Sequence, residues 1–127
     1  MASSIKDYRE FVEKPWGKMF YDLIYRQLAL PADPPLDILD FGAGFCITAG
    51  HYAQHHRVMA VEPNDEMLSL RSSGNCAINC IHGGIEMLRR QSDGSFDLVI
   101  CHNVLEYVPD REQALQEFAR VLRNGGV

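Results

Sequence analysis

The strongest chemical signal in the sequence is a glycine-rich turn that follows a short apolar run. In the stretch ILDFGAGFC, Asp40 stands near the end of the run, and Gly42 and Gly44 come just after it. Glycines let the backbone pass close to a ligand, because no side chain fills the space. In an open parallel sheet, ligands bind beyond the carboxyl ends of the strands, where such a turn lies. The stretch therefore predicts a binding loop.

The residues of this loop also indicate the kind of ligand. A dinucleotide fingerprint needs a further glycine so that the following helix can approach closely, and Ile47 occupies that position. Asp40 is a poor neighbour for a phosphate, since like charges repel, and a good one for an ammonium group. Both features favour a ligand with an amino acid-like end and no phosphate. The alternative is a structural turn that Asp40 caps.

A second acid follows the next apolar run. In VMAVEPNDEML, Glu62 lies about 20 residues after the glycine turn, where an acid can accept hydrogen bonds from both hydroxyls of a ribose. Several adenosine-binding families share such an acid, and a lone Glu at a strand end is more often a solvated charge. With the glycine turn in register and Asn64 as a helix N-cap, we favour the binding interpretation.

The elements that position these residues follow from the order of apolar runs. Four short runs alternate with segments long enough for helical crossovers: Leu36–Phe41, Arg57–Val61, Cys76–Ile81 and Phe96–Cys101. This order predicts an α/β fold in three layers, with a parallel sheet of about four strands and helices on both faces. The fourth run would be an exposed sheet edge, so we expect a dimer partner or a missing C-terminal portion to cover it.

Helices are expected before the sheet. Apolar residues at helical spacing begin at Met19, and a shorter helix over Tyr8–Glu13 is separated from it by Pro15. The prolines of LPADPP then mark a linker. We therefore predict a helical segment and linker over 1–35 and a sheet domain over 36–127.

The last helix has clear boundary signals. Asp110 and Gln113 form a capping box at its start, and Gly125 is placed to end it. Its expected apolar face consists of Ala114, Leu115, Phe118, Val121 and Leu122.

Composition sets limits on function. The net charge of −5 gives no general nucleic-acid surface. No apolar run is long enough to span a membrane, and the N-terminus lacks the apolar core of a signal peptide. The cysteines form no CxxC pair, so a reduced, cytoplasmic protein is expected.

Two groups of side chains resemble metal sites. A zinc site built from Cys76, Cys80 and His82 lacks a convincing fourth ligand. The cluster of His51, His55 and His56 has no acid in the right register, and we expect it to be a solvated helix end. No metal site is therefore predicted.

With these motifs the chain resembles a class I S-adenosylmethionine-dependent methyltransferase. From about Leu36 to the C-terminus, four stretches match the family's motifs in order: ILDFGAGFC, VMAVEPNDEML, IHGGIEML and FDLVICHNVLEYVPDREQALQEFARVLRNGG. The resemblance implies a Rossmann-like sheet that binds S-adenosylmethionine, and transfer of the cofactor's methyl group to an acceptor. The chain departs from the family at Cys46, where glycine is common, at Gly84, where Asp is common, and in having fewer strands.

The resemblance implies roles for five residues around the first two motifs. The backbone of Gly42 and Gly44 would run alongside the methionyl part of the cofactor, and Asp40 would help to hold its ammonium group. Glu62 would bind the ribose hydroxyls, and Pro63 would pack beside the adenine.

Further residues are implied by the later motifs and the N-terminal helices. Ile85 would cover the adenine, and Cys101 and His102 would line the wall near the sulfonium. Trp16 and Tyr21 would close over the cofactor. Methyl transfer mainly needs positioning, and no catalytic residue or general base is assigned.

The methyl acceptor is not evident from the residues, and small molecules, tRNA and proteins are all open as acceptors. A small molecule is favoured, and the acidic charge disfavours RNA. One alternative is a non-catalytic subunit that binds adenosylmethionine. A second is an NAD-dependent oxidoreductase, against which Asp40 and the missing glycine count.

Overall fold

The computed structural model describes residues 5–71, 78–102 and 108–127. By its internal contacts the chain divides into two compact units, residues 1–32 and 33–127. The second unit alternates strands and helices in this order: β1 (Asp37–Phe41), α3 (Ile47–Tyr52), β2 (Arg57–Glu62), α4 (Asp65–Ser69), β3 (Ile78–His82), α5 (Ile85–Leu88), β4 (Leu98–Ile100) and α6 (Arg111–Val121).

The first unit consists of two packed helices, α1 (Ile5–Glu13) and α2 (Pro15–Leu28). Proline begins α2 rather than merely ending α1, because the first helical position needs no N–H donor. The spacing of apolar residues predicts that this helix starts at Met19. The observed start at Pro15 is four residues earlier. No helix in the described parts of the chain is both long and apolar enough to cross a membrane.

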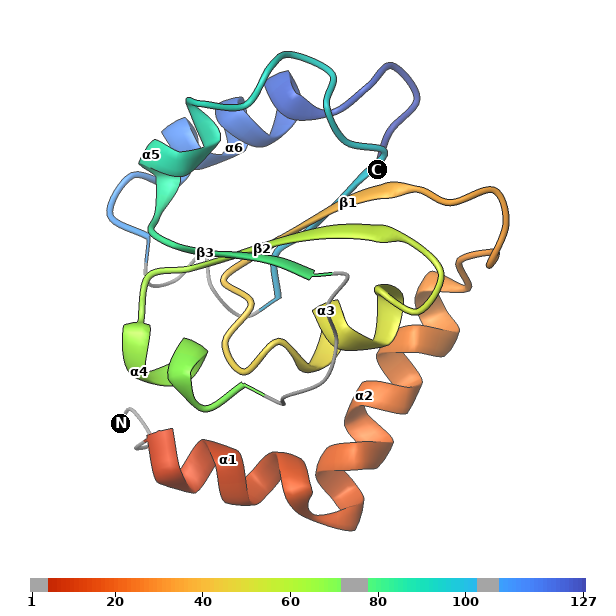
Figure 1. Cartoon of the computed structure of the whole chain (residues 1–127), viewed down its shortest axis with the longest axis vertical. Coiled ribbons are helices and arrows are strands. Elements are labelled where there is room, and N and C mark those ends of the chain that lie inside the picture. The colour runs from red at the N-terminus through yellow and green to blue at the C-terminus, as the bar shows by residue number, and fades with distance from the viewer. Residues whose placement is uncertain (1–4, 72–77, 103–107) are drawn as a thin grey trace. The chain divides into compact units, whose positions relative to one another are not determined.

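The sheet of the second unit is parallel, with the strand order β3-β2-β1-β4 (Figure 1). This confirms the expected four-stranded sheet. From β1 the chain builds outward through β2 to β3, and β4 then joins on the other side of β1. Such a reversal is a topological switch point, and the crevice outside the strand ends at this point is where open α/β sheets bind ligands.

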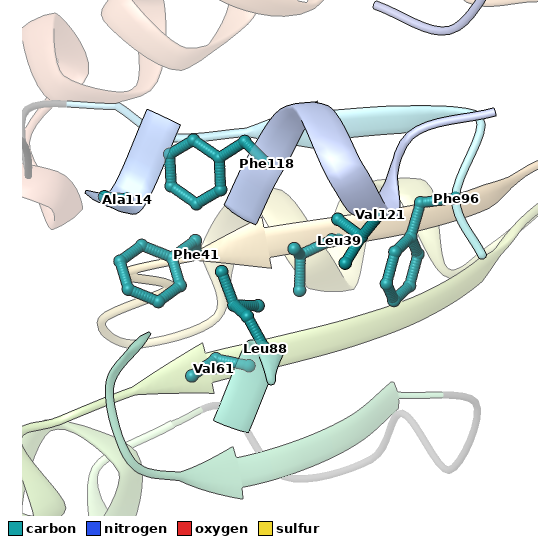
Figure 2. Packing of buried hydrophobic residues seen from close by; sticks show 8 residues of the cluster. All are labelled: Leu39, Phe41, Val61, Leu88, Phe96, Ala114, Phe118 and Val121. Carbon is teal, nitrogen blue, oxygen red and sulfur yellow. The ribbon is translucent and has the colours of Figure 1, made fainter. Parts of the chain in front are cut away.

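One face of the sheet carries a hydrophobic core, which α5 and α6 cover. Figure 2 shows how its buried side chains meet: Leu39, Phe41, Val61, Leu88, Phe96, Ala114, Phe118 and Val121. The rings of Phe41 and Phe118 pack edge to face, with centroids 5.2 Å apart. Helices α3 and α4 lie on the opposite face (Figure 1). The expected helices on both faces are confirmed.

Two details of α6 differ from the prediction. Its start is as expected, since the Asp110 carboxylate accepts the Gln113 N–H at 2.9 Å. Leu115, however, is 53% exposed, because it lies one position away from the buried stripe. The helix also ends at Val121, well before Gly125, because Leu122 is extended and bridges to the chain just before β4.

The histidines in and after α3 also differ from the prediction in part. His56 is buried, and its Nδ1 accepts the Leu36 N–H at 3.0 Å. This histidine therefore ties Leu36, just before β1, to the turn before β2, whereas His51 and His55 are exposed as expected.

Ion pairs stabilise the end of the sheet where the strands begin. The Asp37 carboxylate binds Arg57 at 2.6 Å and Arg123 at 2.8 Å, and Arg123 also binds Asp97 at 2.8 Å. At the edge of the sheet, the N–H of Val99 donates to the carbonyl oxygen of Val127 at 2.9 Å.

Candidate functional site

The centre of the candidate site is the Glu62 carboxylate at the end of β2. One oxygen, Oε1, accepts the Gly44 N–H at 2.8 Å, and the other, Oε2, accepts the Asn64 N–H at 2.8 Å. Glu62 is 6% exposed, and these two donors make burial of its charge tolerable. The acid therefore joins the glycine loop to the start of α4, a role that its position in the sequence did not reveal.

The glycine loop folds back over the end of β2. The N–H groups of Gly42 and Ala43 donate to the Val61 carbonyl oxygen at 2.7 and 3.1 Å. Gly42 and Gly44 have φ values of 80° and 58°, in the left-handed region that side chains disfavour. A Cβ at Gly44 would also lie 3.1 Å from the Met67 methyl carbon. Both glycines are thus required by the shape of the loop.

Asp40, near the end of β1 and just before this loop, carries a buried carboxyl group. It is 4% exposed, and no described residue forms a hydrogen bond with its carboxyl oxygens. Burial, and secondarily the negative charge of Glu62, raises the pKa of Asp40 to about 7. A cation placed beside Asp40 would favour the charged carboxylate and lower the pKa of Asp40 again.

Cys101 and His102 follow the end of β4, which pairs with β1 on the side opposite β2. Burial, and secondarily the charge of Asp40, raises the pKa of the Cys101 thiol to about 11. The next residue, His102, is exposed, although partial loss of water around its ring lowers its pKa. The structure thus brings Asp40, Gly44, Glu62 and Cys101 to one end of the sheet.

The remaining predicted residues lie further from this centre. Pro63 is exposed, and its carbonyl oxygen lies 2.9 Å from Nε2 of His82. Ile85 is half-buried at the start of α5 and packs against the core. Trp16 and Tyr21 belong to α2 in the first unit, and their closing over a ligand stays a prediction.

One charged group near the third motif was missed. The carboxylate of Glu86 accepts the Gly84 N–H at 2.8 Å, and this hydrogen bond is the main reason why the pKa of Glu86 is lowered. Its acid thus lies beside the position where the family commonly has Asp. The motif IHGGIEML contains this acid, but only the folded turn brings it back to Gly84.

No metal site is evident among residues 5–71, 78–102 and 108–127, where no group of three His, Cys, Asp or Glu side chains could hold an ion. Cys76, a member of the zinc alternative, lies outside the described residues.

Comparison with known proteins identifies the family. The profile of the family described as "Methyltransferase domain" matches residues 39–127, which include the whole candidate site. The chain belongs to this methyltransferase domain family. Its parallel sheet is the Rossmann-like sheet of class I S-adenosylmethionine-dependent methyltransferases.

Individual relatives agree with this assignment. The methyltransferase domain is 46% identical over 52 residues to a mouse arsenite methyltransferase, covering 39% of this chain and 14% of the relative. It is 32% identical over 96 residues to the human thiol S-methyltransferase TMT1B, covering 71% of this chain and 39% of the relative. Both relatives are much longer than this chain.

A solved structure shows the same arrangement. The domain superposes on a putative methyltransferase from an antibiotic biosynthesis pathway of Anabaena variabilis with a TM-score of 0.70 and 28% identity. The match covers 85% of this chain and 42% of that protein.

Proposed function

We propose that this methyltransferase domain binds S-adenosylmethionine at the carboxyl ends of β1 and β2 and transfers its methyl group to a small-molecule acceptor. The observation that carries the proposal is the buried Glu62 carboxylate, which holds the Gly44 amide at 2.8 Å. This bond shapes the loop and leaves an acid at the place where a ribose lies in nucleotide-binding sheets of this topology.

The donor and acceptor groups fit the cofactor. A carboxylate has about four lone-pair positions, so Glu62 keeps capacity for two ribose hydroxyls after binding two backbone amides. Asp40 offers a buried acid that lacks a hydrogen bond from any described residue, and the ammonium group of the cofactor would supply the missing cation. Gly44, whose positive φ disfavours any side chain, lets the loop keep this shape.

The proposed chemistry demands little beyond orientation from the chain. The bound cofactor supplies a methyl group on a positive sulfonium, which an acceptor nucleophile attacks in line. The loop would hold the cofactor's amino acid end, Glu62 would fix the ribose, and the wall at Cys101 would limit access of water. Such positioning alone accounts for much of the rate of a transfer between two bound groups.

We further propose that Glu86 substitutes for the Asp that the family commonly has at Gly84. Its carboxylate is already held by the Gly84 N–H, and it retains acceptor capacity for the amino group of an adenine. Replacing Glu86 with Gln should weaken binding of S-adenosylhomocysteine more than binding of its analogue that lacks the adenine amino group. An equal loss for both ligands would contradict this role.

A small-molecule acceptor is supported by the relatives, which are named for arsenite and for thiols. The chain spans 14% to 39% of the length of the curated relatives with which it is compared. Acceptor binding by the whole protein is therefore part of this proposal.

Binding is tested first by calorimetric titration of the chain with S-adenosylhomocysteine, with NADH as the comparison ligand. We expect saturable one-to-one binding of the first and none of the second. Glu62→Ala should weaken binding about tenfold to a hundredfold, because charge-assisted hydrogen bonds are lost. Glu112→Ala, which removes an exposed acid on α6, is the matched control and should bind normally.

Circular dichroism of each variant separates loss of the site from loss of the fold. Failure of a folded wild-type chain to bind S-adenosylhomocysteine would overturn the proposal, and binding of NADH instead would favour an oxidoreductase. Transfer of a labelled methyl group to one of a panel of small thiols and amines would support the enzyme. Binding without transfer to any acceptor would favour a non-catalytic subunit.

A further inference from the structure

Two cysteines that are distant in the sequence meet beside the glycine loop. The Sγ atoms of Cys46 and Cys80 lie 3.8 Å apart, in non-bonded contact. Cys46 directly precedes α3 at the end of the loop, and Cys80 lies in the middle of β3. The proposed methyl transfer uses neither thiol.

The strand register and the backbone of the loop bring these two cysteines together. Asp40, Ala60 and Cys80 are aligned across β1, β2 and β3, so their side chains leave the same face of the sheet. Ala60, whose side chain is a single methyl group, stands between Asp40 and Cys80 in this row. Cys46 has a φ of 60°, a conformation in which a residue other than glycine is uncommon.

The two thiols differ in access. Cys80 is partly exposed on β3, which is an edge strand of the described sheet. Cys46 is buried, and burial is the main cause that raises the pKa of its thiol to about 12. An oxidant from solution would therefore reach Cys80 first, and Cys46 is already in contact to resolve the product.

We propose that Cys46 and Cys80 are an oxidation site, at which a hydroperoxide forms a disulfide that distorts the glycine loop and weakens cofactor binding. The effect on the cofactor rests on the proposed function. The formation of the disulfide does not depend on the proposed function.

The chemistry needs one equivalent of hydroperoxide. The Cys80 thiolate attacks the peroxide, the O–O bond breaks, and the products are a Cys80 sulfenic acid and hydroxide or alkoxide, which takes up the thiol proton. The Cys46 sulfur then displaces the sulfenic oxygen, which leaves as water with the Cys46 proton. Two thiols are thereby oxidised to one disulfide, and the peroxide is reduced.

The consequence for the loop follows from distance. A disulfide requires sulfur atoms about 2.0 Å apart, so the two sulfur atoms must approach each other from 3.8 Å. The backbone ladder to β2 restrains β3, so much of this movement falls on Cys46. Cys46 is two residues from Gly44, whose N–H must stay near Glu62 to keep the loop in shape.

The bond itself is tested by peptide mapping after treatment with hydrogen peroxide. Tryptic cleavage places Cys46 in the peptide 27–57, Cys101 in 91–111, and both Cys76 and Cys80 in 72–89. In the Cys76→Ser variant, we expect a crosslink between 27–57 and 72–89, which dithiothreitol removes. Adding Cys80→Ser to the Cys76→Ser variant should abolish this crosslink. Its absence in Cys76→Ser, or crosslinks to 91–111 in its place, would overturn the proposal.

The effect on the site is tested by titrating reduced and oxidised Cys76→Ser with S-adenosylhomocysteine. We expect oxidation to lower the affinity about tenfold or more, and dithiothreitol to restore it. Cys80→Ser should bind equally before and after peroxide. A complete crosslink with unchanged affinity would refute control of the loop. Crosslinking in a chain that never binds the ligand would instead refute the proposed function.

Discussion

The burial of Asp40 makes a specific prediction about the pH dependence of stability. The pKa of Asp40 is raised from 3.8 to about 7, mainly by burial. The folded chain therefore retains this proton up to about pH 7, whereas an unfolded chain releases it near pH 4. Stability from the protonated carboxyl is complete below about pH 4 and is lost as the pH rises through 7.

The magnitude follows from this difference in pKa between the two states. Each tenfold difference in proton affinity corresponds to about 1.4 kcal/mol, so the change in folding free energy between pH 4 and pH 8 is roughly 3–4 kcal/mol. Asp40→Asn keeps the size of the side chain and removes its ionisation. The free energy of unfolding of the variant relative to the wild type should therefore rise by about this amount from pH 4 to pH 8.

Urea unfolding of both chains at a series of pH values measures this difference. Asp22→Asn removes an exposed carboxylate of α2 and is the matched control, which should show no comparable change. A constant difference between Asp40→Asn and the wild type from pH 4 to pH 8 would refute the reasoning. At pH 8 the same variant should bind S-adenosylhomocysteine more weakly, because its amide cannot pair with the ammonium group.

Three further predictions concern the glycine loop and the two helices that cover the core shown in Figure 2. Gly44→Ala should lower the free energy of unfolding by about 1–2 kcal/mol, because alanine is strained at positive φ; an unchanged urea midpoint would contradict this. Arg120→Met should lower the urea midpoint, since the guanidinium binds the carbonyl oxygens of Leu88 and Gln91 at 2.7 and 2.8 Å, and Arg120→Lys should recover only part of the loss. Asp110→Ala should cost about 1 kcal/mol, and Asp110→Asn should restore the cap; equal losses for both would show that the cap is not the cause.

The order of strands and helices was predictable because it depends on local patterns. Short apolar runs mark the strands, and a capping box marks the start of α6. The misplaced features arise where tertiary context decides. Pro15 could interrupt a helix or begin one, and Leu115 is next to a buried position but faces solvent.

The candidate site was predictable in its residue types but not in its internal bonds. The glycine turn and Glu62 stand out by spacing, because the carboxyl ends of parallel strands meet at one edge. The Glu62–Gly44 hydrogen bond depends on the loop folding back, and the Cys46–Cys80 contact joins residues 34 positions apart. No local pattern encodes either contact.

The central claim is that the cofactor lies against the glycine loop and the end of β2. The most direct test is an amide chemical-shift titration of the isotope-labelled chain with S-adenosylhomocysteine. We predict that the amides of Gly44 and Asn64, both bound to Glu62, shift strongly, whereas that of Gly94, bound to Arg120, does not. Saturation of the ligand with Gly44 and Asn64 unchanged would contradict the account.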